Sequence, residues 1–154
     1  MMAKPKVFLD SSGLISSMIS TRVGTPMHRL LALGEGNAID LRTSREVISD
    51  AERFARHKNA ALLPRAAALV AFANLAITTE PSESTIVFCE SLTGYRPDAR
   101  VLAASIECGA DVFVTHDKTH LLGNPKIRPP QVAVLVMSPQ DCLRWCFKQW
   151  KSAL

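Results

Sequence analysis

Two short apolar runs in this chain each lead directly into acidic residues. Residues 6–9 (KVFL) are followed by Asp10, and residues 112–114 (VFV) are followed by Thr115 and then Asp117. Uniformly apolar runs of this length are typical of strands that are buried on both faces of a parallel sheet. Since the carboxyl ends of parallel strands border the crevice where ligands bind, we expect both aspartates at one edge of a sheet.

The rest of the chain alternates between strand-like and helix-like segments. We expect strands at residues 6–9, 38–42, 86–89, 112–114 and 132–137. We expect helices at residues 13–19, 26–33, 45–57, 64–78, 98–107 and from 139 onward. Alternation of this kind predicts an α/β fold with a mostly parallel sheet covered by helices on both faces. No repeat or linker divides the chain, so we expect one domain over residues 1–154.

Composition narrows the class of protein. A chain of 154 residues with 47% hydrophobic residues can bury one core, which argues against disorder. The net charge of +4 gives a weak bias toward polyanions. The longest apolar stretch, residues 66–77, is shorter than the ~20 residues of a membrane helix, and we expect it to be a core helix. Residues 1–6 lack the apolar core of a signal peptide, so we expect a cytoplasmic protein.

The four cysteines do not suggest a metal site or a disulfide framework. Cys89, Cys108, Cys142 and Cys146 show neither a Cys-x-x-Cys pair nor a histidine at zinc-finger spacing. We expect them to pack as small apolar side chains. The terminal segment 142–150 is strongly apolar, which favours core packing, with a partner surface as the alternative.

A third acid is expected near the first two. Asp98 lies in the first turn of the predicted helix 98–107. A first-turn aspartate often serves only to stabilise the helix N-terminus. Here, however, the 3.6-residue period places it on the same arc as the apolar positions of that helix. It would then face the core at the edge that carries Asp10 and Asp117; the arc consists of Val101, Leu102, Ser105 and Ile106.

The helix 45–57, which Thr43 or Ser44 would cap, offers further acids. Asp50 borders one edge of its apolar arc and Glu52 the other, and Glu46 lies one turn before Asp50, further into solvent. Periodicity does not choose between Asp50 and Glu52. Surface salt bridges with arginines of the same helix are the alternative role for all three acids.

Four segments of the chain resemble the motifs of the PIN-domain nucleases, the fold of the toxin ribonucleases of toxin–antitoxin pairs. Residues 7–16 (VFLDSSGLIS) are similar to the family's opening strand-Leu-Asp-Thr-Asn-x-Leu-Ile, and residues 44–50 (SREVISD) to its Ser-x-x-apolar-apolar-x-Glu. Residues 98–105 (DARVLAAS) are similar to Asp-x-x-apolar-apolar-x-x-Ala. Residues 110–117 (ADVFVTHD), followed by two leucines, are similar to Ala-Asp-x-apolar-apolar-Thr-x-Asp. The order and spacing match over nearly the whole chain.

The resemblance implies a three-layer α/β/α sandwich around a sheet of about five strands, and a metal-dependent ribonuclease. It implies that Asp10, Asp98 and Asp117 bind Mg²⁺ or Mn²⁺ and that Asp50 holds a water or a second ion. Thr115 would hydrogen-bond an acid or a substrate phosphate, and Ser12 stands where the family has a metal-site asparagine. RNA, an antitoxin protein and a second copy of the chain are the implied partners. No catalytic role is assigned to His116 or His120, which flank the site. By their positions in the sequence, four cations are candidates for phosphate contacts: Arg22, Arg96, Arg100 and Lys118.

Two departures from the family pattern leave other functions open. Ser12 replaces asparagine, and Asp50 is one methylene shorter than the usual glutamate. A PIN fold that binds RNA or a protein without cleaving is therefore the main alternative. A receiver-like phosphoacceptor would need paired acids after its first strand and a lysine after a late strand. A phosphatase with Asp10 as nucleophile would need a second aspartate where this chain has Ser12.

Overall fold

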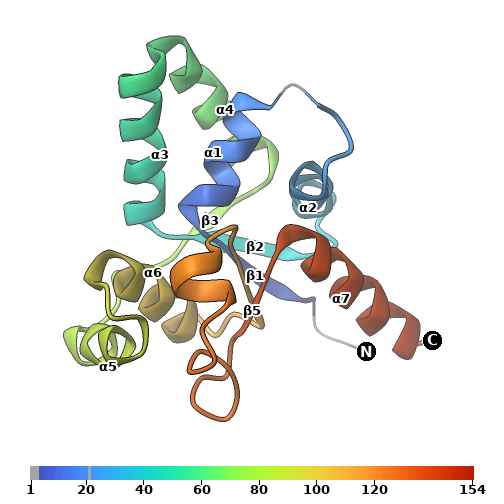
Figure 1. Cartoon of the computed structure of the whole chain (residues 1–154). Coiled ribbons are helices and arrows are strands. Elements are labelled where there is room, and N and C mark those ends of the chain that lie inside the picture. The colour runs from blue at the N-terminus through green and yellow to red at the C-terminus, as the bar shows by residue number, and fades with distance from the viewer. Residues whose placement is uncertain (1–3, 21) are drawn as a thin grey trace.

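The computed structural model describes residues 4–20 and 22–154 (Figure 1). Residues 1–3, which begin the segment that argued against a signal peptide, lie outside this range. The centre is a five-stranded parallel sheet in the order β3-β2-β1-β4-β5, which confirms the expected α/β class with helices on both faces of a central sheet. The strands are β1 (Lys6–Leu9), β2 (Asp40–Thr43), β3 (Ala76–Ile77), β4 (Val112–Val114) and β5 (Leu135–Met137).

The strand order creates one special position in the sheet. The chain passes from β1 outward to β2 and β3, and then returns to the other side of β1 to form β4 and β5. The strand order therefore reverses between β1 and β4, whose registered pairs include Phe8 with Phe113. Such switch points leave a crevice at the carboxyl ends of the two strands. Asp10 and Thr115 directly follow β1 and β4 at this position.

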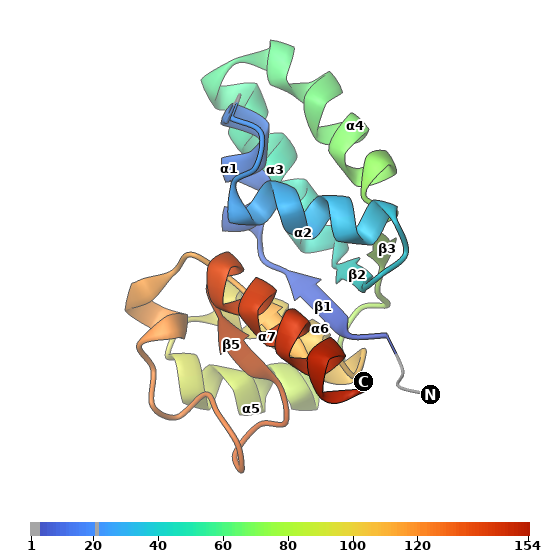
Figure 2. The same cartoon turned by 90° about the vertical axis from the view of Figure 1, so that its right-hand side faces the viewer.

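Seven α-helices surround the sheet in the described part of the chain. Helices α2 and α7 lie side by side on one side of it, and α5 and α6 lie on the other (Figures 1 and 2). Helices α1, α3 and α4 pack against one another at the top of the view (Figure 1). The bounds are α1 (Ser11–Ile19), α2 (Pro26–Glu35), α3 (Arg45–Lys58), α4 (Leu63–Phe72), α5 (Glu83–Thr93), α6 (Arg96–Glu107) and α7 (Pro139–Ser152). A 3-10 turn (Ala60–Leu62) precedes α4, and a single π-helical turn, η2 (Lys118–Leu122), follows β4.

Two of the expected elements are wrong. Residues 86–89 form part of helix α5 rather than a strand. The β-branched and aromatic run there suggested a strand, but Ile86, Cys89 and Thr93 are buried at helical spacing, and Gly94 ends the helix in the left-handed conformation with φ 70°. The helical spacing of the buried residues therefore determined the structure more than the strand propensity of residues 86–89 did.

The helix expected at residues 64–78 is also shorter than predicted. Helix α4 ends at Phe72, and residues 76–77 instead pair with β2 as the edge strand β3. Asn74 makes the turn with φ 53°, a conformation that asparagine tolerates better than most residues. No residue of α4 is fully buried, but four of its apolar residues pack half-buried against the core, so the helix borders the core instead of lying inside it: Leu63, Ala66, Leu69 and Val70. Among residues 4–20 and 22–154, no helix is both long and apolar enough to cross a membrane.

The core is built on the paired central strands. The rings of Phe8 and Phe113 stack with centroids 5.6 Å apart, and neither residue is exposed. As expected, the cysteines are free thiols that pack as small apolar groups: Cys89, Cys142 and Cys146 are buried and Cys108 is half-buried. Pro139 and Ser138 begin α7, whose buried face of Cys142, Leu143 and Cys146 joins this core.

We expect Gly34→Ala to destabilise the protein. Gly34 lies on the buried face of α2, where an added Cβ would collide with Leu41 of β2 and lie 2.7 Å from the Ala73 carbonyl oxygen. Overpacking of this kind costs about 1–3 kcal/mol. The matched control is Gly36→Ala, whose Cβ would have its nearest neighbour at 3.5 Å. Denaturant unfolding of both variants measures the effect, and equal stability of the two would contradict this packing.

Candidate functional site

Asp10 is the buried acid at the end of β1. It is 8% exposed and forms the N-cap of α1, where its Oδ1 accepts a hydrogen bond from the Ser11 amide at 2.8 Å. Its Oδ2 accepts from Thr115 Oγ1 at 2.7 Å and from Ser12 Oγ at 3.4 Å. Burial raises the pKa of Asp10, while the hydrogen bonds from Thr115 and Ser11 act in the opposite direction.

Thr115 and Ser12 connect this acid to the segment after β4. Thr115 is fully buried, and its hydroxyl donates to Asp10 while accepting from the Asp117 amide at 3.0 Å. Ser12 Oγ accepts from the His116 amide at 3.0 Å. Thr115 therefore binds an acid, one of its two expected roles. Ser12 joins the start of α1 to the loop that carries Asp117.

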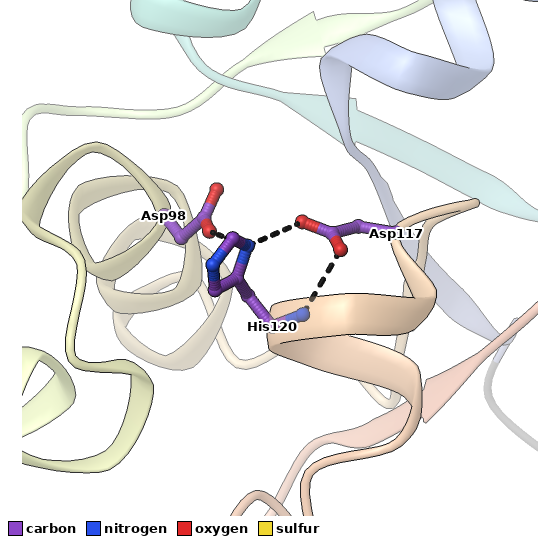
Figure 3. Close-up of side chains that lie close together, drawn as sticks. All are labelled: Asp98, Asp117 and His120. Atoms are coloured by element: carbon purple, nitrogen blue, oxygen red, sulfur yellow. Dashed lines mark hydrogen bonds and ion pairs between the residues drawn. The ribbon is translucent and has the colours of Figure 1, made fainter.

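Asp117, Asp98 and His120 form the exposed part of the site (Figure 3). Asp117 Oδ1 accepts from the Thr119 and His120 amides at 2.9 and 3.0 Å, which holds its carboxylate at the start of η2. The ring atom His120 Nδ1 lies 3.5 Å from Asp117 Oδ2 and 3.5 Å from Asp98 Oδ2. One atom from each of the three side chains lies within 4.8 Å of the others.

The pKa of Asp98 reflects its burial and the negative charges beside it. Asp98 lies in the first turn of α6, and its pKa is raised to about 6, first by burial and then by the charges of Asp117 and Asp10. Its Oδ2 is buried and accepts no hydrogen bond from any described residue. The contact with His120 is an ion pair when the imidazole is protonated. An unpartnered oxygen beside two like charges is suited to a bound cation.

The donor set fits a divalent metal ion. Asp98 and Asp117 offer carboxylate oxygens, which Mg²⁺ and Mn²⁺ prefer, and His120 offers a ring nitrogen. Asp10 lies outside this group of three, and its oxygens accept hydrogen bonds from Thr115 and Ser11. The structure thus brings Asp98 and Asp117 together and places Asp10 beside them, linked through Thr115.

His120 is the site residue that sequence reasoning missed. Its ring is stacked on Tyr95, with centroids 5.6 Å apart and the planes inclined by 21°. That contact and the η2 turn together point the imidazole at both carboxylates. The sequence offered one weak indication, namely that His120 stands three residues after Asp117, but nothing in the residue pattern predicts a π-helical turn.

The acids of α3 separate into two environments. Asp50 pairs with Arg53 at 3.1 Å, and its charge is close enough to contribute to the raised pKa of Asp98. Glu52 lies on the other side of the helix, in a groove between α1, α3 and α4, and pairs with Arg56 at 3.9 Å. The structure therefore places Asp50, rather than Glu52, on the side of the site.

Glu46 differs from its expected position. Its side chain is 31% exposed, about the same as the 33% of Asp50, rather than further into solvent. It lies 3.9 Å from Arg100 of α6, and burial raises its pKa while Arg100 opposes that effect. Glu46 thus links α3 to the helix that carries Asp98, which keeps it beside the site.

Two of the arginines considered for phosphate contacts already have acidic partners. Arg96 binds both Glu83 and Glu90 of α5, so it joins α5 to α6 instead of facing the site unpaired. Arg100 is the partner of Glu46. Asp111 Oδ2 accepts a hydrogen bond from the Lys6 amide at 2.8 Å, and therefore supports the start of β1.

Comparison with known proteins supports the fold and names no activity. No family model matches the sequence, and no curated protein sequence matches it. The crystal structure of PAE2754 from Pyrobaculum aerophilum is similar over 95% of this chain and 99% of that one, with a TM-score of 0.60 and 14% sequence identity. At this identity the likeness shows a common three-layer α/β/α fold and nothing further.

We expect Asp98→Asn to stabilise the metal-free protein at neutral pH. The folded pKa of about 6 exceeds the ordinary value of 3.8, so the wild type loses stability as the pH rises from about 4 to 7. Asparagine carries no charge, so the variant should gain on the order of 1–3 kcal/mol over the wild type across that window. Thermal unfolding in chelator at pH 4 and pH 7.5 measures this, with the exposed Asp141→Asn as control. A stability difference that does not grow with pH would contradict the assignment.

Proposed function

We propose that this chain is a divalent-metal-dependent ribonuclease. The observation that carries the proposal is the pair Asp98 and Asp117, whose oxygens lie together at the switch point of a parallel sheet, one of them buried without a hydrogen-bond partner. The resemblance of four segments to the PIN nucleases supports the same function. Mg²⁺ or Mn²⁺ is the proposed cofactor, because an empty acid cluster would repel a phosphate backbone and a cation reverses that effect.

The side chains of this site have separate proposed roles. Asp98 and Asp117 would hold the metal ion, which when bound lowers the pKa of a water and offsets negative charge on the phosphate. Asp10 supplies a third negative charge beside this pair, and the hydrogen bond from Thr115 fixes the orientation of its carboxylate. Asp50 would act from the rim of the site, where it can hold a water.

His120 requires a role that the family pattern did not suggest. In its protonated form it neutralises the two carboxylates and occupies the place of a cation. In its neutral form it can offer Nδ1 as a ligand or accept a hydrogen bond from a water at the site. Its stacking on Tyr95 keeps the ring in place for either state.

A binding module without cleavage is the second candidate, and one observation favours it. Asp50 is shorter than glutamate, and its carboxylate is engaged by Arg53 at 3.1 Å. If that pair persists, the second acid is unavailable to the site. Metal binding without cleavage of any RNA would identify this alternative.

The partners and location belong to the same proposal. We propose that the protein acts in the cytoplasm and, from the PIN resemblance, that it forms a homodimer and pairs with an antitoxin protein. Light scattering of the purified chain tests the dimer. Co-purification of this chain with the product of the gene adjacent to its own tests the pairing with an antitoxin.

We expect the wild type to cleave single-stranded RNA with Mg²⁺ or Mn²⁺, and chelator to stop the reaction. Asp117→Asn removes a charged ligand while an amide oxygen still accepts from the Thr119 and His120 amides, so the fold should survive. Its activity should fall by at least about a hundredfold. Both proteins are prepared in parallel and assayed on a mixed RNA pool. Equal activity would reveal a contaminating nuclease, and an inactive wild type with intact metal binding would favour the binding module.

We expect Asp50→Asn to lower cleavage at least about tenfold and Glu52→Gln to leave it within about twofold, since Asp50 lies on the side of the site and Glu52 faces the α1–α3–α4 groove. The two residues are on the same helix and each pairs with an arginine, so they form a matched comparison. Initial rates at saturating Mg²⁺ measure the effect. If Glu52→Gln lowers cleavage more than Asp50→Asn does, then Glu52 and not Asp50 is the second acid of the site.

A further inference from the structure

A hollow lies next to the segment that leads into Asp117. It has a volume of about 380 Å³ and lies between α1 and the first turns of α2 and α7. His116, which directly precedes Asp117, lines one end, and Ser16 Oγ lies 3.5 Å from its Nε2. Besides His116 and Gln140, its polar lining consists of hydroxyl side chains from three helices or their caps: Ser16, Ser17, Ser20, Thr25 and Ser138.

A second hollow continues from the first. It also has a volume of about 380 Å³, and Pro26 and Gln140 line both hollows, so the two adjoin. It lies between α2 and α7, which run side by side (Figure 2). Arg29 of α2 and Arg144 of α7 line it together with Phe147. The two adjoining hollows, called the path below, therefore extend from His116 to a basic and aromatic region.

The charge of this path favours a polyanion. Arg29 is exposed and Arg144 is 71% exposed. Arg144 contacts Asp141 at 3.3 Å, but exposed pairs of this kind are weak, so the guanidinium can exchange that partner for a phosphate. Helical spacing places Lys148 and Lys151 on the same face of α7 as Arg144.

Phe147 gives the path a stacking surface. Its ring is 58% exposed although it is large and apolar. The half-buried Trp150 contacts it edge to face, with centroids 5.3 Å apart and planes at 86°. That contact restrains the ring and leaves one face free, so stacking a base on it would cost little side-chain entropy.

We propose that a single-stranded RNA extends from the acidic site through both hollows, with its phosphates near Arg29 and Arg144 and a base stacked on Phe147. This inference rests on the proposed ribonuclease function and adds the route by which the strand is held. Cations beside an exposed aromatic ring are the combination that binds single strands without strong sequence preference. An RNA duplex keeps its bases stacked inside and cannot use Phe147 in this way.

The test is direct binding of a fluorescein-labelled 12-nucleotide oligouridylate, measured by fluorescence anisotropy in chelator so that no cleavage interferes. Phe147→Ala should weaken binding at least about fivefold and leave the salt dependence of Kd unchanged. Arg29→Ala and Arg144→Ala should each lower the slope of log Kd against log salt by about 0.7, the value for one lost phosphate contact on a single strand.

Matched controls lie away from α2 and α7. Phe88→Ala removes a similarly exposed phenylalanine from α5, and Lys58→Ala removes an exposed cation from the end of α3. Both should bind the oligonucleotide as the wild type does. Path variants that match these controls, or equal affinity for a 12-base-pair RNA duplex, would overturn the inference.

Cleavage of the same oligonucleotide by the wild type with Mn²⁺ is measured separately, so the two proposals can fail independently. Binding that depends on Phe147 and the two arginines, without cleavage, supports the path and contradicts the nuclease. Cleavage with unchanged binding in the path variants does the reverse.

Discussion

The hydrogen bonds around Asp10 hold together the part of the molecule that carries the site. One carboxylate oxygen accepts from the first amide of α1, and the other accepts from Thr115 at the end of β4. A single buried acid thus fixes the start of a helix and the relative position of the two central strands. Burying a carboxylate is costly unless donors surround it, and here three donors from two segments do so.

The same arrangement concentrates negative charge where the strand order reverses. Asp10 is compensated by its donors, whereas Asp98 has an oxygen without a partner and a pKa raised to about 6. Asp10 therefore maintains the structure, whereas Asp98 and Asp117 repel each other, and a bound cation would relieve that repulsion. Sites that give up stability in this way are common where function requires a charge.

Helix α7 serves two surfaces at once. Its inner face of Cys142, Leu143 and Cys146 completes the core. Its outer face carries cations and the exposed ring of Phe147, next to α2. The strongly apolar terminal segment therefore packs against the core, as its sequence favoured, and leaves the ring of Phe147 exposed. The two hollows of the proposed RNA path meet at the first turn of this helix, where Gln140 lines both.

The sequence by itself determined the central strands, the parallel sheet and three of the acids. The apolar run 112–114 forms a strand as expected, and the residue that follows a strand must lie at its carboxyl edge. The helical period likewise placed Asp98 toward that edge. These features are local, so the pattern of residues along the chain was sufficient to predict them.

Tertiary structure alone decided the rest. Residues 76–77 became a strand because β2 offered an unpaired edge, and residues 86–89 became helical because α5 buries a stripe against its neighbours. The helical period did not separate Asp50 from Glu52, and the packing of α1 and α4 decides which side of α3 faces the groove. His120 joined the site through a π-helical turn and the ring of Tyr95, which is 25 residues away in sequence. Contacts between distant segments set each of these outcomes, and no local period encodes such contacts.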